Sequence, residues 1–204
     1  MRVIVAFSTL VLFVAGCGSA HKATKTTGIS SKCPVTGKQV TFLLLDPSKT
    51  YTATVQTNLG TFAFTLDVKD SPCTTSSFAR LARRHFYDGL IFHRIVPGFV
   101  IQGGDPNGNG SGGPGYTVVD TPPANASYTR GVVAMAKTGT DPAGTSGSQF
   151  FVVTGADAGL PPQYALLGKV TSGLAVVLRI GRLGDPQTEQ PTRRIEMRKV
   201  TVSP

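Results

Sequence analysis

Short strand-like segments separated by glycine-rich loops make up most of the sequence from residue 51 onward, and this pattern constrains the fold most strongly. Residues 51–56 and 61–66 alternate between polar and apolar side chains, and the turn-forming residues 58–60 between them predict a hairpin. The other segments with strand character are residues 91–95, 99–102, 117–119, 132–136, 149–153, 165–170 and 194–198. Such a succession of short strands favours a sheet that closes on itself.

Helical spacing is confined to two segments. Pro72 follows Ser71, which predicts an N-cap with proline in the first turn, and apolar residues then recur at helical spacing until about residues 87–89. A second helix is expected over residues 174–182, with its apolar side chains on one side. Many strands and so few helices indicate a mainly β fold, a closed antiparallel barrel capped by two α-helices.

The N-terminal residues differ in character from the rest of the chain. The chain has 204 residues with 40% hydrophobic content, enough for one domain with its own core. Residues 1–16 combine a basic start, an apolar run too short to span a bilayer and small residues, which predicts a signal peptide for export. We expect residues 17–50 to be a flexible tether and lead-in, and residues 51–204 to be the globular domain.

Val14-Ala15-Gly16-Cys17 resembles a bacterial lipobox, in which the cysteine is lipidated and becomes the mature N-terminus. Two or more acyl chains on Cys17 suffice for stable membrane anchoring. The chain is then expected at the outer face of the cytoplasmic membrane. The alternative is ordinary signal cleavage, with Cys17 incidental.

Cys33 and Cys73 remain as an even pair if Cys17 carries lipid. Disulfides persist in the oxidising environment outside the cytoplasm, so a bridge would tie the end of the tether to the start of the first helix. Two unpaired thiols are the alternative, because the sequence does not reveal whether the two α-carbons approach closely enough.

The formal net charge of +9 raises the question of a nucleic-acid partner. The basic residues are dispersed along the tether, the first helix and the C-terminal segment, and no nucleic-acid-binding motif accompanies them. We therefore expect no nucleic acid as a partner, and a monomer whose basic surface faces anionic lipid headgroups or solvent.

Residues 92–105 place one arginine and one glutamine among aromatic and aliphatic residues at strand spacing. Such a surface suits an apolar ligand and can polarise one of its atoms. The run closely resembles the Phe-His-Arg-x-x-x-x-Phe-x-x-Gln-Gly-Gly-Asp signature of the cyclophilin family of peptidyl-prolyl isomerases, and residues 135–136 with 147–151 match the family's second signature. The resemblance extends from about residue 51 to 202 and implies an eight-stranded barrel and isomerisation of proline-containing polypeptides.

The chemistry that this resemblance implies requires one hydrogen-bond donor. When an X-Pro amide twists, its resonance breaks and the prolyl nitrogen regains a lone pair, which a donor can stabilise in the transition state alone. Arg94 is the expected donor, since its guanidinium stays charged and offers a rigid fork of N–H groups. The reaction needs no covalent nucleophile, metal or cofactor.

The family pattern also assigns the remaining site residues. Gln102 is expected to position Arg94 and contact the substrate backbone. The hydrophobic proline pocket and the adjoining groove fall on Phe99, Val100, Phe151, Leu160, Ala136 and Gln149. On spacing alone, each apolar member would be read as ordinary core.

Three positions depart from the best-known eukaryotic pattern. Gly159 stands where those members carry tryptophan, Tyr164 replaces a pocket histidine, and Lys137 replaces the asparagine after the pocket alanine. Tyr164 should still provide a flat wall for proline, together with a hydroxyl. His93 is expected at the rim of the site, in a binding or structural role rather than as a proton carrier, because no partner spacing for catalysis accompanies it.

Two other functions remain open at this point. A chaperone or scaffold would use the same groove to hold proline-containing segments without isomerising them, and an adhesion protein would rely on basic surface charge.

A third motif, the G-x-G-x-x-G pattern of residues 108–113, is expected to be a loop, since Pro114 prevents the helix that a dinucleotide site needs.

Overall fold

The computed structural model describes residues 33–204, so the expected signal peptide, Cys17 and most of the expected tether lie outside the described residues. Its main sheet is antiparallel and has eight strands in the order β11-β2-β3-β10-β7-β9-β5-β4. These strands are β2 (Thr52–Thr57), β3 (Gly60–Leu66), β4 (Phe92–Val96), β5 (Val100–Gly103), β7 (Val132–Met135), β9 (Phe150–Val153), β10 (Leu166–Ser172) and β11 (Met197–Ser203). Within residues 33–204, no helix is both long and apolar enough to cross a membrane.

The sheet curls until its two edge strands meet. The residues just before β4 and β11 are joined by a bridge between Ile91 and Glu196, and beside it the amide of Phe92 donates to the carbonyl of Ile195 at 3.0 Å. The expected eight antiparallel strands and two helices are confirmed. Closure depends on this short seam, however, rather than on a continuous ladder of hydrogen bonds between the edge strands.

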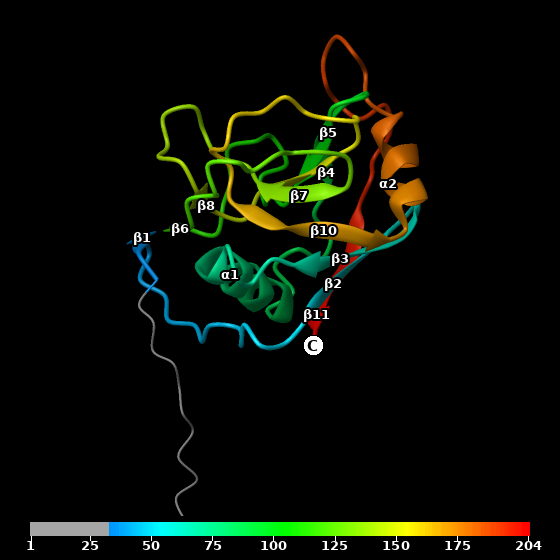
Figure 1. The fold of residues 1–204 in the computed structure, drawn as a ribbon. Helices are drawn as coiled ribbons and strands as arrows, with labels where there is room; N and C mark the ends of the chain where they lie inside the picture. Colours follow the sequence, from blue (N-terminus) through cyan, green and yellow to red (C-terminus); the bar gives the residue numbers. More distant parts are fainter. Residues whose placement is uncertain (1–32) are drawn as a thin grey trace, which may run out of the picture.

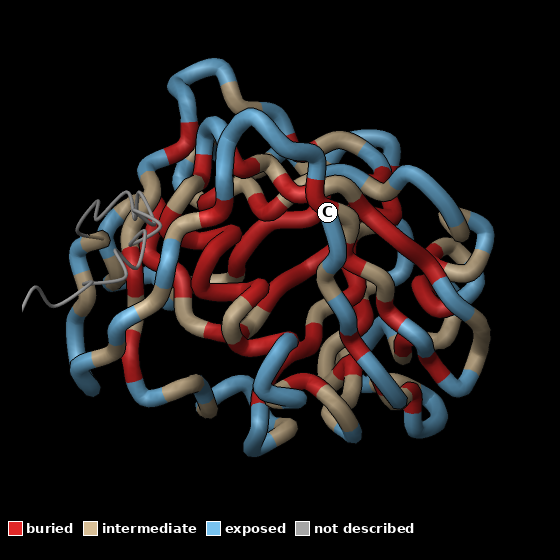
Figure 2. Tube along the Cα trace, turned by 90° about the horizontal axis from the view of Figure 1, so that it is seen from below, coloured by how far each residue is buried: buried red, intermediate tan, exposed pale blue. Residues whose placement is uncertain are grey.

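Aromatic side chains fill the inside of the curled sheet. Phe62, Phe78, Phe92 and Phe150 are fully or almost fully buried there, and Figure 2 shows the buried residues gathered inside the exposed loops. Helix α1 (Pro72–Arg83) contributes Phe78, while α2 (Leu174–Gly181) contributes Val177 and Ile180. In Figure 1 the two helices lie at opposite ends of the curled sheet, as expected for a capped barrel.

Helix α1 starts as predicted but is capped and ended differently. Proline stands in its first turn, whereas the Ser71 hydroxyl makes no cap hydrogen bond and has no partner anywhere in the described chain. The helix ends earlier than predicted because His85 adopts a positive φ of 57°, and the amide of Phe86 then reaches back to the carbonyl of Leu81 at 3.1 Å. This is a Schellman-type ending with histidine in the position that glycine usually takes.

A small second sheet was not predicted as such. It consists of β1 (Val35–Gly37), β6 (Tyr116–Val119) and β8 (Thr145–Ser146), and only β6 had been expected as a strand. Strand β1 lies in the segment expected to be lead-in, and a disulfide between Cys33 and Cys73, with α-carbons 5.6 Å apart, ties its start to α1. The lead-in therefore packs on the domain from residue 33 onward.

Removing this disulfide should destabilise the folded chain. The bridge joins residues 40 positions apart, and closing a loop of that length contributes about 2 to 4 kcal/mol through the unfolded state. We expect the double variant Cys33→Ala/Cys73→Ala to lose that amount in urea unfolding under oxidising conditions. A reductant should bring the wild-type chain to the same midpoint and leave the variant unchanged; equal stability of the two oxidised proteins would contradict the prediction.

Candidate active site

The strand register of the main sheet brings the expected site residues into one row. Arg94 pairs with Gln102 across β4 and β5, Gln102 with Phe151 across β5 and β9, and Phe151 with Ala134 across β9 and β7. A cavity of about 300 Å³ opens over this row. Its walls are Arg94, Phe99, Val100, Gln102, Ala136, Lys137, Phe151, Leu160 and Tyr164. The apolar residues expected to hold proline thus meet at one place, together with Arg94 and Gln102.

A bulge in β4 turns Arg94 toward this cavity. The register between β4 and β5 shifts between Phe92 and Arg94, and such a bulge interrupts the alternation of side chains. Phe92 and Ile95 consequently pack in the core, while Arg94 lines the cavity. Uninterrupted alternation would have placed Phe92 and Arg94 on the same face of the sheet, and the bulge separates them.

The apolar part of the cavity is a second hydrophobic cluster outside the barrel core. The ring of Phe151 meets that of Tyr164 edge-on, with centroids 5.6 Å apart. The hydroxyl of Tyr128 donates to the carbonyl of Tyr164 at 2.6 Å and accepts from its amide at 2.9 Å. Tyr128 therefore fixes the wall residue Tyr164, a role for which the sequence held no signal.

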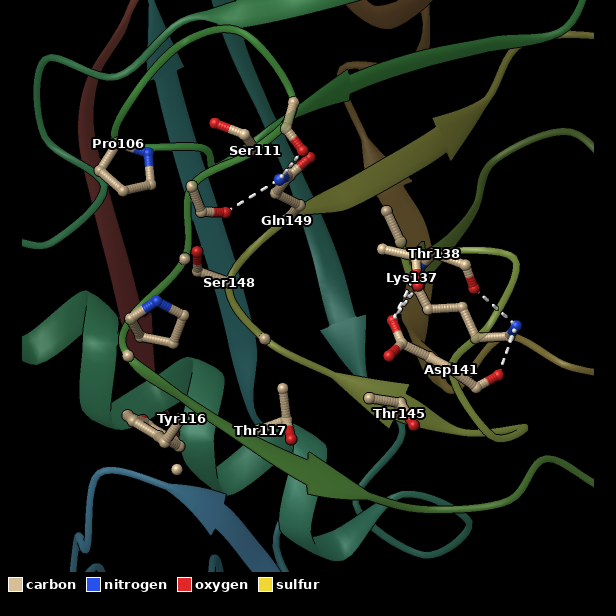
Figure 3. Close-up of a pocket in the computed structure, with 18 of the residues that line it drawn as sticks. Pro106, Ser111, Tyr116, Thr117, Lys137, Thr138, Asp141, Thr145, Ser148 and Gln149 are labelled. Atoms are coloured by element: carbon tan, nitrogen blue, oxygen red, sulfur yellow. Dashed lines mark hydrogen bonds between the residues drawn. The ribbon is translucent and has the colours of Figure 1, made fainter.

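A larger cavity of about 740 Å³ adjoins the first and shares Gln102, Ala136 and Lys137 with it. Figure 3 shows that the Lys137 ammonium folds back over its own loop, where it donates to the carbonyls of Thr138 (3.1 Å) and Asp141 (3.0 Å). The ammonium also lies 5.6 Å from the centre of the Tyr164 ring. Lys137 thus fastens the loop after β7 and lines both cavities.

A chain of side-chain amides links Arg94 to the larger cavity. Arg94 Nη1 donates to Gln102 Oε1 at 3.4 Å, and Gln102 Nε2 donates to Gln149 Oε1 at 3.0 Å. Gln149 Nε2 in turn donates to the carbonyls of Gly110 (2.8 Å) and Gly112 (2.9 Å), as the dashed lines in Figure 3 show. Gln149 lines only the larger cavity, so its place is beside the proline pocket and not in it.

Arg94 has a second, shorter contact that the sequence analysis missed. Its Nε donates to Glu189 Oε2 at 2.6 Å, and the partner comes from a loop 95 residues further along the chain. No local pattern could have paired two residues so far apart.

The glycine-rich residues 108–113 form a loop, and no helix begins there. The Asp105 carboxylate organises this loop by accepting from the amides of Asn107 (2.8 Å), Asn109 (2.9 Å) and Gly110 (2.5 Å). Burial alone would raise the pKa of Asp105, but these hydrogen bonds outweigh it and hold the pKa below its ordinary value. The expected loop is thus what the structure has.

His93 lines neither of the two cavities. Both of its ring nitrogens are buried, and neither finds a hydrogen-bond partner within residues 33–204. Burial lowers the pKa of His93 below its ordinary value; Asp105 acts in the opposite direction, and Arg94 adds a further lowering. The imidazole is therefore neutral at pH 7. His93 directly precedes Arg94 in β4 but does not line the cavity that Arg94 lines.

The half-buried His93, whose ring nitrogens are shielded from solvent, should make the fold sensitive to mild acid. Because its pKa is lowered in the folded state, the unfolded chain binds the proton more readily, and stability present above about pH 6.5 is lost as the pH falls below it. We expect His93→Phe to weaken this loss in urea unfolding between pH 7.5 and 5.5. Burial raises the pKa of Asp67 and Asp120, whose contribution to stability has the opposite sign and falls nearer pH 4. If the stability of His93→Phe depends on pH as steeply as that of the wild type, His93 is not the group responsible.

Comparisons with known proteins point to one family. The model of the cyclophilin type peptidyl-prolyl cis-trans isomerase family matches residues 52–202. A peptidyl-prolyl cis-trans isomerase of Helicobacter pylori is 40% identical over 151 residues, which cover 67% of this chain and 91% of that protein. Peptidyl-prolyl cis-trans isomerase B of Bacillus subtilis is 46% identical over 112 residues, 54% of this chain and 76% of that protein.

A solved structure is similar as well. The crystal structure of a cyclophilin type peptidyl-prolyl cis-trans isomerase from Cryptosporidium parvum matches with a TM-score of 0.69 at 27% identity, over 76% of this chain and 99% of that one. The signature residues, the curled eight-stranded sheet and the cavity beside Arg94 lead to the same conclusion as these matches. The chain therefore belongs to the family of cyclophilin-type peptidyl-prolyl cis-trans isomerases and is an enzyme of that class.

Proposed function

We propose that this isomerase acts outside the cytoplasm, on X-Pro bonds of exported or surface proteins, and thereby assists their folding. The observation that carries the chemistry is the Arg94 guanidinium at the rim of an apolar cavity of about 300 Å³. Uncatalysed X-Pro isomerisation takes tens to hundreds of seconds and delays folding. Newly exported chains that must fold without cytoplasmic help are suitable clients.

The site residues divide the work between binding and catalysis. Phe99, Phe151 and Leu160 offer apolar surface to the proline ring, and the Gln102 amide faces the substrate backbone. Arg94 donates to the prolyl nitrogen once the bond has twisted and the nitrogen lone pair has formed. Because that lone pair is delocalised in the planar amide, this interaction stabilises the transition state more than the bound substrate.

The N-terminal sequence supports the location. Residues 1–16 read as a signal peptide and Cys17 as a lipidated residue, so the enzyme would be held at the outer face of the membrane through two or more acyl chains. The disulfide between Cys33 and Cys73 supports an oxidising compartment. A flexible tether of roughly 14 residues would span about 20 Å and would keep the enzyme close to the membrane.

One experiment tests activity and anchoring together. The full chain and its Cys17→Ser variant are expressed in a bacterial host with radiolabelled palmitate, and membrane fractions are assayed for cis-to-trans isomerisation of an X-Pro peptide. We expect label and membrane activity for the wild type, and neither label nor retention for Cys17→Ser. The wild type should accelerate the refolding of an exported protein whose slow phase is limited by proline isomerisation. Isomerase activity without incorporated palmitate would refute the lipid anchor and leave the enzymatic activity standing.

A further inference from the structure

The guanidinium of Arg94 makes two hydrogen bonds of unequal strength in the structure. The bond from Nη1 to the neutral Gln102 amide is 3.4 Å long, near the upper limit for such a contact. The bond from Nε to the Glu189 carboxylate is 2.6 Å long and joins opposite charges. Charge-assisted bonds of this length are about twice as strong as neutral ones. Glu189, rather than Gln102, therefore dominates the orientation of Arg94.

The loop after α2 is built so that Glu189 lies opposite Arg94. The bridge between Gly184 and Pro191 closes the base of the loop, and the amide of Glu189 donates to the carbonyl of Asp185 at 2.8 Å. The carbonyl of Glu189 accepts from the amide of Ile95, the residue after Arg94, also at 2.8 Å. This last bond ties the loop to β4 and fixes which residue faces the arginine.

Glu189 adopts a backbone conformation that is uncommon for its type. Its φ is +58°, in the left-handed region that glycine enters more readily than residues with a side chain. Two backbone hydrogen bonds hold it there, at its amide and at its carbonyl. Strain of this kind often accompanies a functional side chain, because the surrounding structure must maintain it.

The pair is too exposed to serve mainly as a stabilising contact. The side chains of Arg94 and Glu189 are 35% and 44% exposed, and ion pairs open to solvent add little to stability. Among the ion pairs in residues 33–204, Glu189 is the one carboxylate within reach of Arg94. The effect of Glu189 is therefore expected on the function of Arg94 and not on the stability of the fold.

We propose that Glu189 is the positioning residue of the catalytic arginine. Its carboxylate holds the Nε edge of Arg94, which sets the plane of the guanidinium and leaves Nη2 directed to the prolyl nitrogen. This inference rests on the proposed function, in which Arg94 is the donor. Without the carboxylate the long arginine side chain samples several rotamers, so fewer bound peptides meet a correctly placed N–H group.

The test separates the isomerisation rate on bound peptide from the affinity for peptide, using the full chain in detergent and exchange NMR on a saturating X-Pro peptide. We expect Glu189→Ala to slow cis–trans exchange of the bound peptide by about tenfold, because a small misplacement of a catalytic group is costly. The peptide Kd should change by less than about twofold. Glu189→Gln keeps an acceptor oxygen and should recover part of the rate. The melting temperature should shift by no more than about 2 °C.

The matched control is Glu196→Gln. Glu196 also accepts from an arginine Nε, that of Arg194 at 3.2 Å, but it lines neither cavity. Its variant should isomerise at the wild-type rate. A spectroscopic check uses protein with ¹⁵N-labelled arginine: the Nε–H resonance of Arg94 should be slow to exchange with solvent in the wild type and lose that protection in Glu189→Ala.

The outcomes distinguish this proposal from the one on which it rests. If Arg94→Ala is as fast as the wild type, the catalytic role of Arg94 fails. If Arg94→Ala is slow while Glu189→Ala equals or exceeds the wild-type rate, only the positioning role fails. In the Arg94→Ala background, Glu189→Ala should cost nothing further, since its effect acts through the arginine; an additional tenfold loss there would overturn the proposal.

Discussion

Replacing Arg94 by alanine should lower the isomerisation rate by about a hundredfold to a thousandfold, since one or two charge-assisted hydrogen bonds of about 1.5 to 3 kcal/mol would be lost in the transition state. The affinity for peptide should change far less, because the planar amide in the bound substrate offers no free lone pair to the donor. A protease-coupled or NMR assay on an X-Pro peptide measures the rate, and calorimetry measures the Kd.

Arg94→Lys is the informative companion to this variant. Lysine keeps the charge but presents it as a point at the end of a flexible stem, without the planar fork that bonds Glu189 and Gln102. We expect it to remain well below the wild-type rate, closer to alanine than to arginine. A fully active Arg94→Lys would mean that charge alone suffices, and a fully active Arg94→Ala would leave the site as a holder of proline segments.

The second large effect is expected at Phe150, whose removal should destabilise the fold. The Phe150 ring is completely buried and packs edge-on against Phe78, Tyr87 and Phe92 at centroid distances of 5.9 to 6.1 Å. Truncating a buried phenylalanine costs about 3 to 5 kcal/mol through lost transfer energy and the cavity left behind. Urea unfolding of Phe150→Ala should show a loss in this range, and a loss below about 1 kcal/mol would contradict it.

Phe151→Ala is the matched variant on the opposite face of the same strand. Its ring lines the proline cavity together with Tyr164, so one side of it already borders open space and its loss leaves less of a new void. We expect a smaller loss of stability than for Phe150→Ala, and peptide binding about tenfold weaker or more, because an apolar wall worth about 1.5 to 3 kcal/mol is gone. Equal stability losses with unchanged binding would disprove this division.

The parts of the fold that were predictable depend on local patterns. The hairpin of β2 and β3 and the two helices followed from alternation, turn residues and helical spacing, and the structure confirms them. The pocket residues required the family motif, because an apolar residue such as Val100 or Leu160 looks like ordinary core on spacing alone. The motif indicated which apolar side chains line the proline cavity.

Other features depend on contacts that leave no local trace. The bulge that turns Arg94 outward is set by pairing with β5, and β1 exists because a partner strand and a disulfide receive it. Glu189 meets Arg94 across 95 residues, through a loop whose register is fixed by a backbone bond to Ile95. Long-range pairing and strained backbone positions of this kind become visible only in three dimensions.

The placement of β1 determines where the N-terminal segment joins the domain. Thr36 and Gly37 of this strand form part of the wall of the larger cavity, and Cys33 pins the chain to the body just before it. The N-terminal segment therefore joins the domain next to the larger cavity, so the lipid that we propose on Cys17 would attach the enzyme to the membrane from that side. Polypeptides would then meet the isomerase as they emerge from the membrane, and before they diffuse away.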